Sequence, residues 1–381
     1  MDSHRRICAN IDLAAIGDNI NQLLDRTKDD SNLMAVIKAD GYGHGALEVA
    51  MATHGHERMW GYGIATIEEA LTLRQGGISK PILLLGFVFP ENYEDILAYD
   101  LRATIFTYAQ AEKLSEIAVA RNKTAQIHIA VDTGMKRIGF DDVPQSIEEI
   151  AKIKALPNIF IEGIFTHFAR ADEKDLSWLE TQFERFSKFV EELEQKGIDI
   201  AMRHCSNSAA VMQYQEANLN IVRAGISIYG LYPSTEMEEG GMELSPAMSI
   251  TSHVTYVKQV RKGEAISYGG TYVAPQDIMV ATIPVGYADG YARSLSNKGY
   301  VLINGQRAPI VGRICMDQFM VDVTTCGDVR EFDEVTLLGR SGDKVITMEE
   351  LGQISGRFNY EFACGINKRV PRVYKGKERG R

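Results

Sequence analysis

The sequence lacks several features that would assign it to a specialised class of protein. No apolar run approaches the roughly 18 residues that a membrane-spanning helix requires. Residues 1–6 are polar and no apolar signal-peptide core follows them, so we expect no secretory leader. The five cysteines form no C-x-x-C pair and the eight histidines no H-E-x-x-H motif, which argues against a disulfide framework and a zinc centre. A reducing cytoplasm is the compartment that fits best.

An excess of positive charge is also missing. Lys and Arg total 41 against 51 Asp and Glu, which gives a net charge of −10. Proteins that bind nucleic acid or anionic membranes generally need a basic surface, so this balance argues against both functions. The basic residues 375–381 are interpreted as a solvated tail. The length of 381 residues suggests two or three domains.

The N-terminal part alternates short apolar segments with helical patterns. The apolar segments are rich in Val, Ile and Leu, as parallel strands buried on both faces should be. The clearest helix is predicted over 176–195, where apolar residues recur at spacings of three and four. The eight predicted strands are Leu33–Lys38, Met59–Ala65, Ile82–Gly86, Leu101–Ile105, Gln126–Val131, Ile159–Phe165, Ile200–His204 and Ile221–Gly225.

Eight such units in roughly 230 residues favour an α/β fold with an N-terminal (β/α)8 TIM-like barrel. An open doubly wound sheet is the alternative, since periodicity does not show closure. Residues 235–246 are interpreted as a linker, and a C-terminal, mostly β domain with little helix follows. We expect domains at 10–238 and 239–381, and residues 1–9 could pack with the second. The strands predicted there are Ser252–Val260, Ile278–Pro284, Tyr300–Ile303, Ala308–Val311, Gln318–Val323 and Glu334–Leu338.

The segment most indicative of chemistry is A-V-I-K-A-D-G-Y-G-H-G at residues 35–45. Lys38 ends an apolar strand, at the edge where barrel active sites lie. Burial lowers the pKa of an amine, as a Schiff-base lysine requires. A snorkelling lysine is the simpler interpretation of Lys38 alone, but the glycines and Tyr42 favour a site. A relaxed Rossmann pattern, G-x-G-x-x-A from Gly41, also fits but gives no reason for Lys38.

Further candidates lie at the ends of other predicted strands. Ser208 follows the seventh strand, and Gly225 and Ile226 close the eighth, the two places where barrels often bind phosphate. His167 and His204 end the sixth and seventh strands, and two histidines at the same end of a barrel favour a site. The single D-T-G at 132–134 does not indicate an aspartic protease, which needs two carboxylates. Arg137 is either a carboxylate anchor or a surface arginine.

Taken together, these residues resemble the alanine racemase family of pyridoxal-phosphate enzymes, over essentially the whole chain. Motif 35–45 is the most specific. The other similar motifs, in the family's order, are D-T-G-M-x-R-x-G at 132–139, V-G-Y-A-D-G at 285–290, G-R-I-C-M-D at 312–317 and R-V-P-R at 369–372.

The resemblance implies a two-base reaction. Lys38 would hold pyridoxal phosphate as an internal aldimine and then act as a base on one face of the substrate α-carbon, while Tyr268 acts on the other. His167 and Arg223 would form a hydrogen-bonded chain behind Tyr268. Arg223 would also meet the pyridine nitrogen, and because arginine keeps its proton, that nitrogen should stay unprotonated.

The resemblance also implies binding roles and a head-to-tail homodimer. Residues that reach the site from the partner chain would be Tyr268, Tyr287 and Met316, giving two shared sites. The expected cofactor contacts besides Lys38 and Arg223 are Tyr42, His204, Ser208, Gly225 and Ile226. The expected substrate contacts are Arg137, Met316, Tyr287 and Asp317. The implied role is the supply of D-alanine for bacterial peptidoglycan.

Two positions depart from the family pattern. Ala130 stands where many members have a lysine, seven residues before the arginine that Arg137 matches. Lys368 lies near the place of a tyrosine that helps hold the phosphate in many relatives. These departures keep open a serine or broad-specificity racemase. A non-catalytic pyridoxal-phosphate-binding protein and a decarboxylase of the same fold type are the remaining alternatives.

Overall fold

A computed structural model describes residues 5–237 and 242–376, which form two compact units. We call residues 16–41 and 46–245 the barrel unit, and residues 1–15, 42–45 and 246–381 the β unit, each as far as it is described. The boundary expected at 238/239 lies outside the described residues, and so does most of the basic tail. Residues 42–45 group with the β unit although they lie shortly after Lys38 in the chain.

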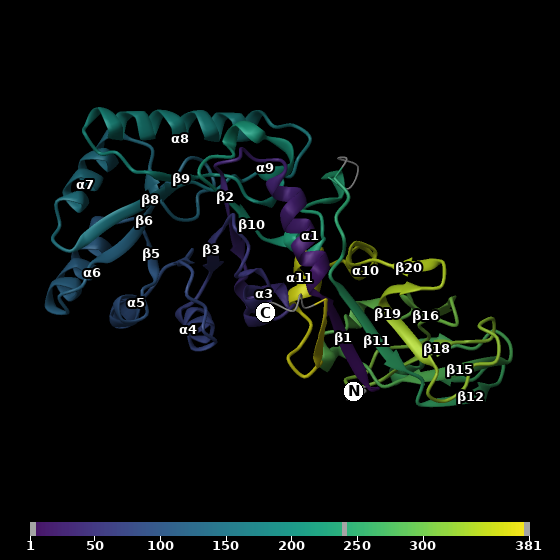
Figure 1. Ribbon diagram of the computed structural model, residues 1–381. Coiled ribbons are helices and arrows are strands. Elements are labelled where there is room, and N and C mark those ends of the chain that lie inside the picture. The colour runs from purple at the N-terminus through teal and green to yellow at the C-terminus, as the bar shows by residue number, and fades with distance from the viewer. Residues whose placement is uncertain (1–4, 238–241, 377–381) are drawn as a thin grey trace. The chain divides into compact units, whose positions relative to one another are not determined.

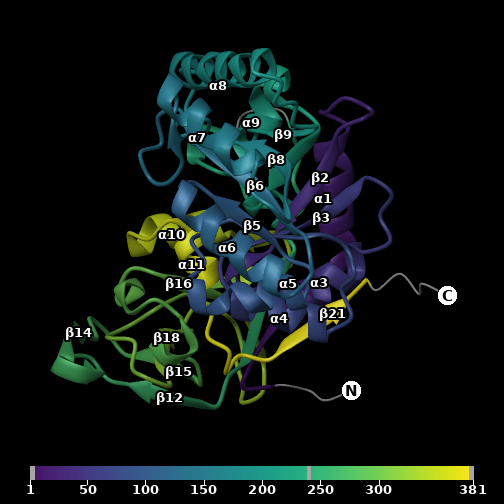
Figure 2. The same ribbon diagram turned by 90° about the vertical axis from the view of Figure 1, so that its left-hand side faces the viewer.

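Eight parallel strands form the barrel unit (Figures 1 and 2). They pair in the order β10-β2-β3-β4-β5-β6-β8-β9, and the Arg223 amide donates to the Ser206 carbonyl at 3.0 Å, which links the two ends of this path. The prediction of a barrel rather than an open sheet is therefore confirmed. The strands are β2 (Asn32–Val36), β3 (Met59–Ile64), β4 (Ile82–Leu84), β5 (Arg102–Ile105), β6 (Ala125–Asp132), β8 (Ile159–Phe165), β9 (Met202–His204) and β10 (Ile221–Ala224).

Several bounds of the barrel strands differ from the predicted ones by one or two residues, and two differences concern local structure. β2 ends at Val36 rather than Lys38, because the chain enters a left-handed turn there. The short strand β7 (Phe140–Asp141), which pairs with β6, was not predicted.

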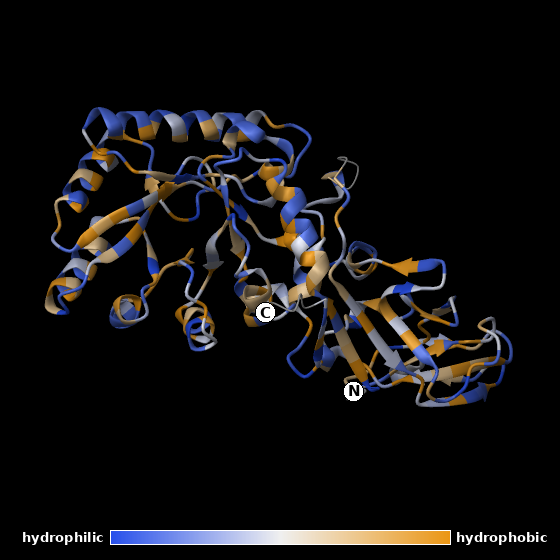
Figure 3. Ribbon diagram, in the orientation of Figure 1, coloured by the Kyte–Doolittle hydropathy of each residue, from blue (hydrophilic) through white to orange (hydrophobic). Residues whose placement is uncertain are grey.

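Helices follow most barrel strands and lie outside them (Figure 1). Thr66 and Thr107 begin α4 and α6 with capping boxes, which satisfy the first N–H groups of each helix. The predicted long helix is α8, along which polar and apolar residues alternate (Figure 3). The helices are α1 (Leu13–Leu24), α3 (Ala46–Thr53), α4 (Ile67–Gln75), α5 (Tyr93–Ala98), α6 (Tyr108–Ala120), α7 (Pro144–Lys154), α8 (Ser177–Gln195) and α9 (Ser208–Gln213).

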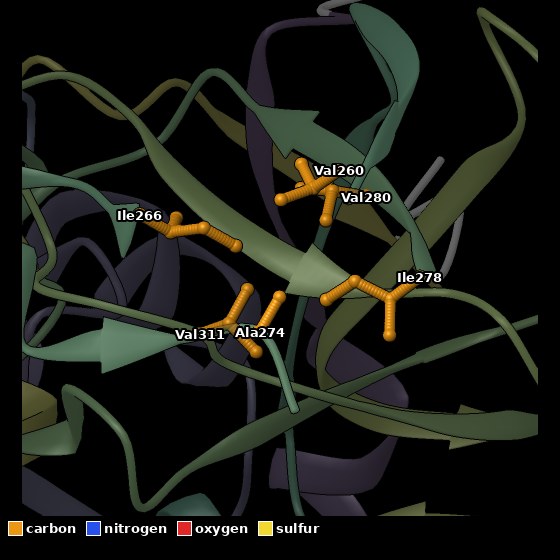
Figure 4. Close-up of a cluster of buried hydrophobic side chains, with 6 residues drawn as sticks. All are labelled: Val260, Ile266, Ala274, Ile278, Val280 and Val311. Atoms are coloured by element: carbon orange, nitrogen blue, oxygen red, sulfur yellow. The ribbon is translucent and has the colours of Figure 1, made fainter. Parts of the chain in front are cut away.

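The β unit contains a sheet in the order β17-β16-β19-β11-β1-β21 and a smaller sheet, β12-β15-β18. The N-terminal strand β1 runs antiparallel to β11 and parallel to β21. Six buried side chains form an apolar cluster in this unit: Val260, Ile266, Ala274, Ile278, Val280 and Val311 (Figure 4). The strands are β1 (Ile7–Asp12), β11 (Met248–His253), β12 (Tyr256–Val260), β13 (Ala265–Ile266), β14 (Tyr272–Val273), β15 (Ile278–Ile283), β16 (Tyr300–Ile303), β17 (Gln306–Pro309), β18 (Phe319–Asp322), β19 (Glu334–Ser341), β20 (Lys344–Ile346) and β21 (Arg372–Lys375).

The single strand predicted over 252–260 was wrong. The chain leaves β11 after His253 and starts β12 in the other sheet at Tyr256, so one apolar run serves two sheets. Two helices, α10 (Met348–Ser355) and α11 (Asn359–Cys364), were also not predicted. Within the described residues, no helix is long and apolar enough to span a bilayer.

Candidate active site

Lys38 begins a tight turn, α2 (Lys38–Tyr42), just beyond the carboxyl end of β2. Residues 39–43 all have positive φ, between 51° and 79°, so the chain makes a turn of left-handed helix. Gly41 and Gly43 adopt this conformation freely, but the three other residues do so at a cost of about 1–2 kcal/mol each. Strain of this kind persists where the surroundings hold it, often at functional sites.

Two carboxylates of the barrel unit hold this turn. Glu69 accepts from the Ala39 amide at 2.6 Å and from the Ala65 amide at 2.8 Å, which ties the turn to the end of β3. Asp40 accepts from the amide of Ala46, the first residue of α3, at 3.1 Å. The backbone beside Lys38 is therefore fixed, while the lysine itself is half-buried.

The loop after β6 presents Arg137. Asp132 accepts from the amides of Gly134 and Lys136 at 2.9 and 3.1 Å, which closes the loop onto the strand end. The Arg185 guanidinium of α8 also donates to the Thr133 carbonyl at 3.1 Å. The Arg137 side chain itself is exposed.

Arg223 is the centre of the polar network inside the barrel. Its guanidinium donates to the carbonyls of Thr166, Cys205 and His204 at 2.7–2.9 Å. It also meets Nδ1 of His204 at 2.8 Å and Nδ1 of His167 at 3.2 Å. The residue is only 4% exposed, and these partners are carbonyls and imidazoles rather than carboxylates.

The same network sets the charges of the two predicted histidines. Burial, followed by the positive charges of Arg223, Arg137 and Lys38, lowers the pKa of His167 well below its usual range. Burial, followed by Arg223, does the same to the pKa of His204. Burial lowers the pKa of Arg223 to about 10, so it stays a cation at neutral pH. The site therefore combines neutral imidazoles with fixed positive charge.

Ser208, Gly225 and Ile226 lie together where the chain leaves β9 and β10. The Ser208 hydroxyl oxygen accepts from the Gly225 amide at 2.9 Å and is buried. Because its oxygen is engaged as an acceptor, its own proton can be donated to an anion. α9 begins at Ser208 and a 3-10 turn at Ile226, and helix starts leave N–H groups that bind anions.

The remaining predicted residues belong to the β unit. Tyr268, Met316 and Asp317 line one hollow of about 680 Å³. Tyr268 is 71% exposed and Met316 53% exposed, which leaves much apolar surface in contact with water. Tyr287 is tied to the same region, since its amide donates to the Cys315 carbonyl at 3.1 Å. Tyr42 lies in the left-handed turn, and its ring meets that of Tyr360 with 5.9 Å between centroids.

A buried carboxylate fixes two loops, one of which lines this hollow. Asp289 accepts from Arg6 at 2.8 Å and from the Gly286 amide at 3.0 Å, and it forms an ion pair with Arg369 at 3.0 Å. Arg369 also pairs with Asp317 at 2.9 Å. Together with the backbone bonds between them, these contacts hold the loops 285–290 and 312–317 as one block.

Sequence reasoning assigned no role to Asp289. It also missed the buried residues His128 and Arg102 and the partly buried Glu162, which extend the Arg223 network. A signal existed for the last three, because a charged or imidazole side chain within an apolar barrel strand needs a partner. Of the two departures, Ala130 is buried in β6 and Lys368 is exposed. Among the described residues, no group of three or more His, Cys, Asp or Glu is placed to hold a metal ion.

The fold and these residues define a class: a parallel barrel with a lysine, an arginine–histidine network and two adjacent helix starts at the carboxyl ends of its strands, joined to a β unit. Comparison with known proteins gives the family. The model of the alanine racemase N-terminal domain matches residues 11–233, and that of the C-terminal domain matches residues 247–374. The chain belongs to the alanine racemase family.

Individual relatives cover nearly the full chain. An alanine racemase of Desulforamulus reducens is 45% identical over 97% of this chain and 99% of its own. The solved alanine racemase of Clostridium difficile 630 is 39% identical, with a TM-score of 0.94 over 98% of this chain and 97% of that one. A histidine racemase from Leuconostoc mesenteroides is 30% identical, with a TM-score of 0.90 over 98% of this chain and 99% of that one.

Proposed function

We propose that this chain is a pyridoxal-phosphate-dependent alanine racemase that interconverts L- and D-alanine. The observation that carries the proposal is the Arg223 centre, a buried cation bonded to the imidazoles of His167 and His204, with Lys38 close enough to affect His167. A buried arginine that serves structure alone is usually paired with a carboxylate. Here the charge lies at the strand ends where the ligand of a barrel enzyme binds.

The residues present fit the cofactor. Lys38 would hold it covalently, Arg223 would donate to its ring nitrogen, and Tyr42, Ser208, Gly225 and Ile226 would hold its phosphate. When bound, pyridoxal phosphate supplies an electron-accepting ring that makes the substrate α-proton acidic. Because Arg223 keeps its own proton, it would act only as a donor toward that ring nitrogen.

Racemisation needs a proton to leave one face of the α-carbon and another to arrive at the opposite face. We assign these roles to Lys38 and to Tyr268 contributed by the second copy of the chain. His167 supports the second role. Its Nδ1 faces the Arg223 guanidinium, so the proton of the neutral ring sits on Nε2, the form that donates to a phenolate. Such a donor makes it easier for a phenol to lose its proton at neutral pH.

Substrate binding would draw on residues of both copies. Arg137 would hold the carboxylate through its fork of donors, assisted by the Met316 backbone, with Tyr287 and Asp317 nearby. The exposure of Tyr268, Tyr287 and Met316 supports a homodimer, because burial against a second copy would cover them. We extend the proposal to a cytoplasmic enzyme that supplies D-alanine for peptidoglycan.

Mixing two inactive variants tests the shared site. Lys38→Ala and Tyr268→Phe should each be inactive as homodimers. After exchange of subunits, about half of the dimers are mixed, and each mixed dimer has one complete site out of two. The mixture should therefore recover about a quarter of the wild-type rate. If Lys38 and Tyr268 of one chain served the same site, mixing would recover nothing and the shared site would be refuted.

A broader racemase is the second candidate, favoured by Ala130, Lys368 and the likeness to a histidine racemase. The purified protein with pyridoxal phosphate is incubated separately with L-alanine, L-serine and L-lysine, and chiral chromatography follows the products. Fast formation of D-alanine alone supports the proposal. Comparable D-serine or D-lysine would move the assignment to the second candidate. Bound cofactor without any D-product would indicate a non-catalytic binding protein.

A further inference from the structure

A hydrogen-bonded chain of polar side chains, all buried except the partly buried Glu162, continues from Arg223 through the barrel interior. His204 Nε2 meets His128 Nδ1 at 2.8 Å, and His128 Nε2 meets a Glu162 carboxylate oxygen at 3.0 Å. Glu162 also accepts from Arg102 at 3.1 Å. These four residues come from β9, β6, β8 and β5, so the chain crosses four strands of the barrel. Neither imidazole is exposed to solvent.

The groups at the two ends of this hydrogen-bonded chain determine which nitrogen of each imidazole carries the proton. The guanidinium of Arg223 can only donate, so Nδ1 of His204 accepts and the ring proton lies on Nε2. That proton points to Nδ1 of His128, which therefore also accepts. The proton of His128, on Nε2, then points to the Glu162 carboxylate, which can only accept. The opposite arrangement would set two donors 2.8 Å apart at Arg223.

The hydrogen-bonded chain also connects the Glu162 carboxylate to the buried Arg223 cation. The bonds of the Arg223 guanidinium go to neutral groups, so they leave its charge without a direct counterion among the described residues. Glu162, whose side chain is 10% exposed, polarises both imidazoles in the direction that makes His204 Nδ1 a better acceptor. A Cβ at Gly163 would overlap the His128 ring, so the glycine leaves room for this imidazole.

We propose that His128 and Glu162 are positioning residues of the active site: through His204, they hold the Arg223 guanidinium in one orientation and as a cation at the place where it meets the ligand. We assign neither residue a contact with substrate or cofactor. The part of this inference that concerns turnover rests on the proposed racemase function, whereas the positions of the protons are a property of the protein by itself.

The first test is a measurement on the unaltered protein. Nitrogen NMR of protein labelled at histidine distinguishes a ring nitrogen that carries a proton from one that does not. At pH 7 both His128 and His204 should be neutral with the proton on Nε2. A proton on Nδ1 of either ring would overturn the proposal whatever the activity of the enzyme.

The second test compares two carboxylates that bind the same arginine. Glu162→Gln removes the negative charge at the end of the hydrogen-bonded chain. Asp100→Asn removes an exposed carboxylate that also pairs with Arg102, at 3.0 Å, but does not belong to the hydrogen-bonded chain. Glu162→Gln should change the NMR signals of both imidazoles. It should also lower kcat at least about 10-fold with little change in KM, as altering a partner behind an active-site group commonly does. Asp100→Asn should leave both readouts unchanged.

The outcomes separate this proposal from the proposed function. Equal effects of Glu162→Gln and Asp100→Asn on the histidine signals, or none from either, would overturn the positioning role. If Glu162→Gln shifts the signals as expected but the wild-type protein racemises no amino acid, the hydrogen-bonded chain stands and the proposed function falls.

Discussion

Lowering the pH from 7 to 5.5 should destabilise the barrel unit, because His128, His167 and His204 are held there without charge. Burial lowers the pKa of all three imidazoles. In the unfolded chain they would titrate near their ordinary pKa of about 6.5, so below that pH the unfolded state binds more protons than the folded state. This contribution to stability is therefore present above about pH 6.5 and is lost as the pH falls.

The magnitude follows from this linkage. A group with an unfolded pKa of about 6.5 that stays neutral when folded loses about 1.3 kcal/mol of stability between pH 7 and pH 5.5. For His167 and His204, whose pKa values lie well below the usual range, this gives about 2.6 kcal/mol, and His128, whose pKa is also lowered, adds to it. That is a large part of the roughly 5–15 kcal/mol by which native proteins are stable.

Urea unfolding of the cofactor-free protein at both pH values, at one protein concentration, measures this loss. In His128→Gln the loss should shrink, by at most about 1.3 kcal/mol, although the variant is also less stable at pH 7. The matched variant is His253→Gln, which removes a half-buried imidazole of the β unit, outside the Arg223 network. A wild-type protein that is equally stable at both pH values would refute the reasoning.

Three further changes have expected outcomes. Gly163→Ala should displace the His128 ring, destabilise the protein by about 1–3 kcal/mol in urea unfolding and alter the His128 NMR signal. Asp289→Asn should cost about 2 kcal/mol at pH 7 in the same assay, because two partly exposed arginines would then face an amide. Tyr268→Phe should slow α-deuterium washout from one alanine enantiomer far more than from the other, and equal slowing for both would contradict the two-base assignment.

The barrel was predictable because its strands are buried on both faces and are therefore nearly continuous apolar runs. The end of β2 was missed for a physical reason, since Ala39, Asp40 and Tyr42 have little intrinsic preference for a left-handed conformation. Hydrogen bonds from residues elsewhere in the fold, such as Glu69, hold the turn, and contacts of this kind leave no local pattern.

In the candidate site, too, some features could be predicted from the sequence and others could not. Lys38, His167 and Arg223 could be placed at the strand ends from the sequence, because each closes or follows an apolar run. The partnership of His128 with Glu162 could not, since residues 34 positions apart meet only once the strands have been set side by side. The sequence also does not show which imidazole nitrogen carries a proton, because that follows from the donors and acceptors around each ring.

The left-handed turn after Lys38 affects which substitutions could raise the folding stability of the protein. Its three residues other than glycine together store roughly 3–6 kcal/mol of backbone strain, which the native contacts offset. A glycine at residue 39 would relieve part of it without removing the bond from that amide to Glu69. The folding stability of the protein is therefore not at its maximum at this turn. A substitution there, natural or engineered, could raise the folding stability next to Lys38, the residue on which the proposed reaction depends.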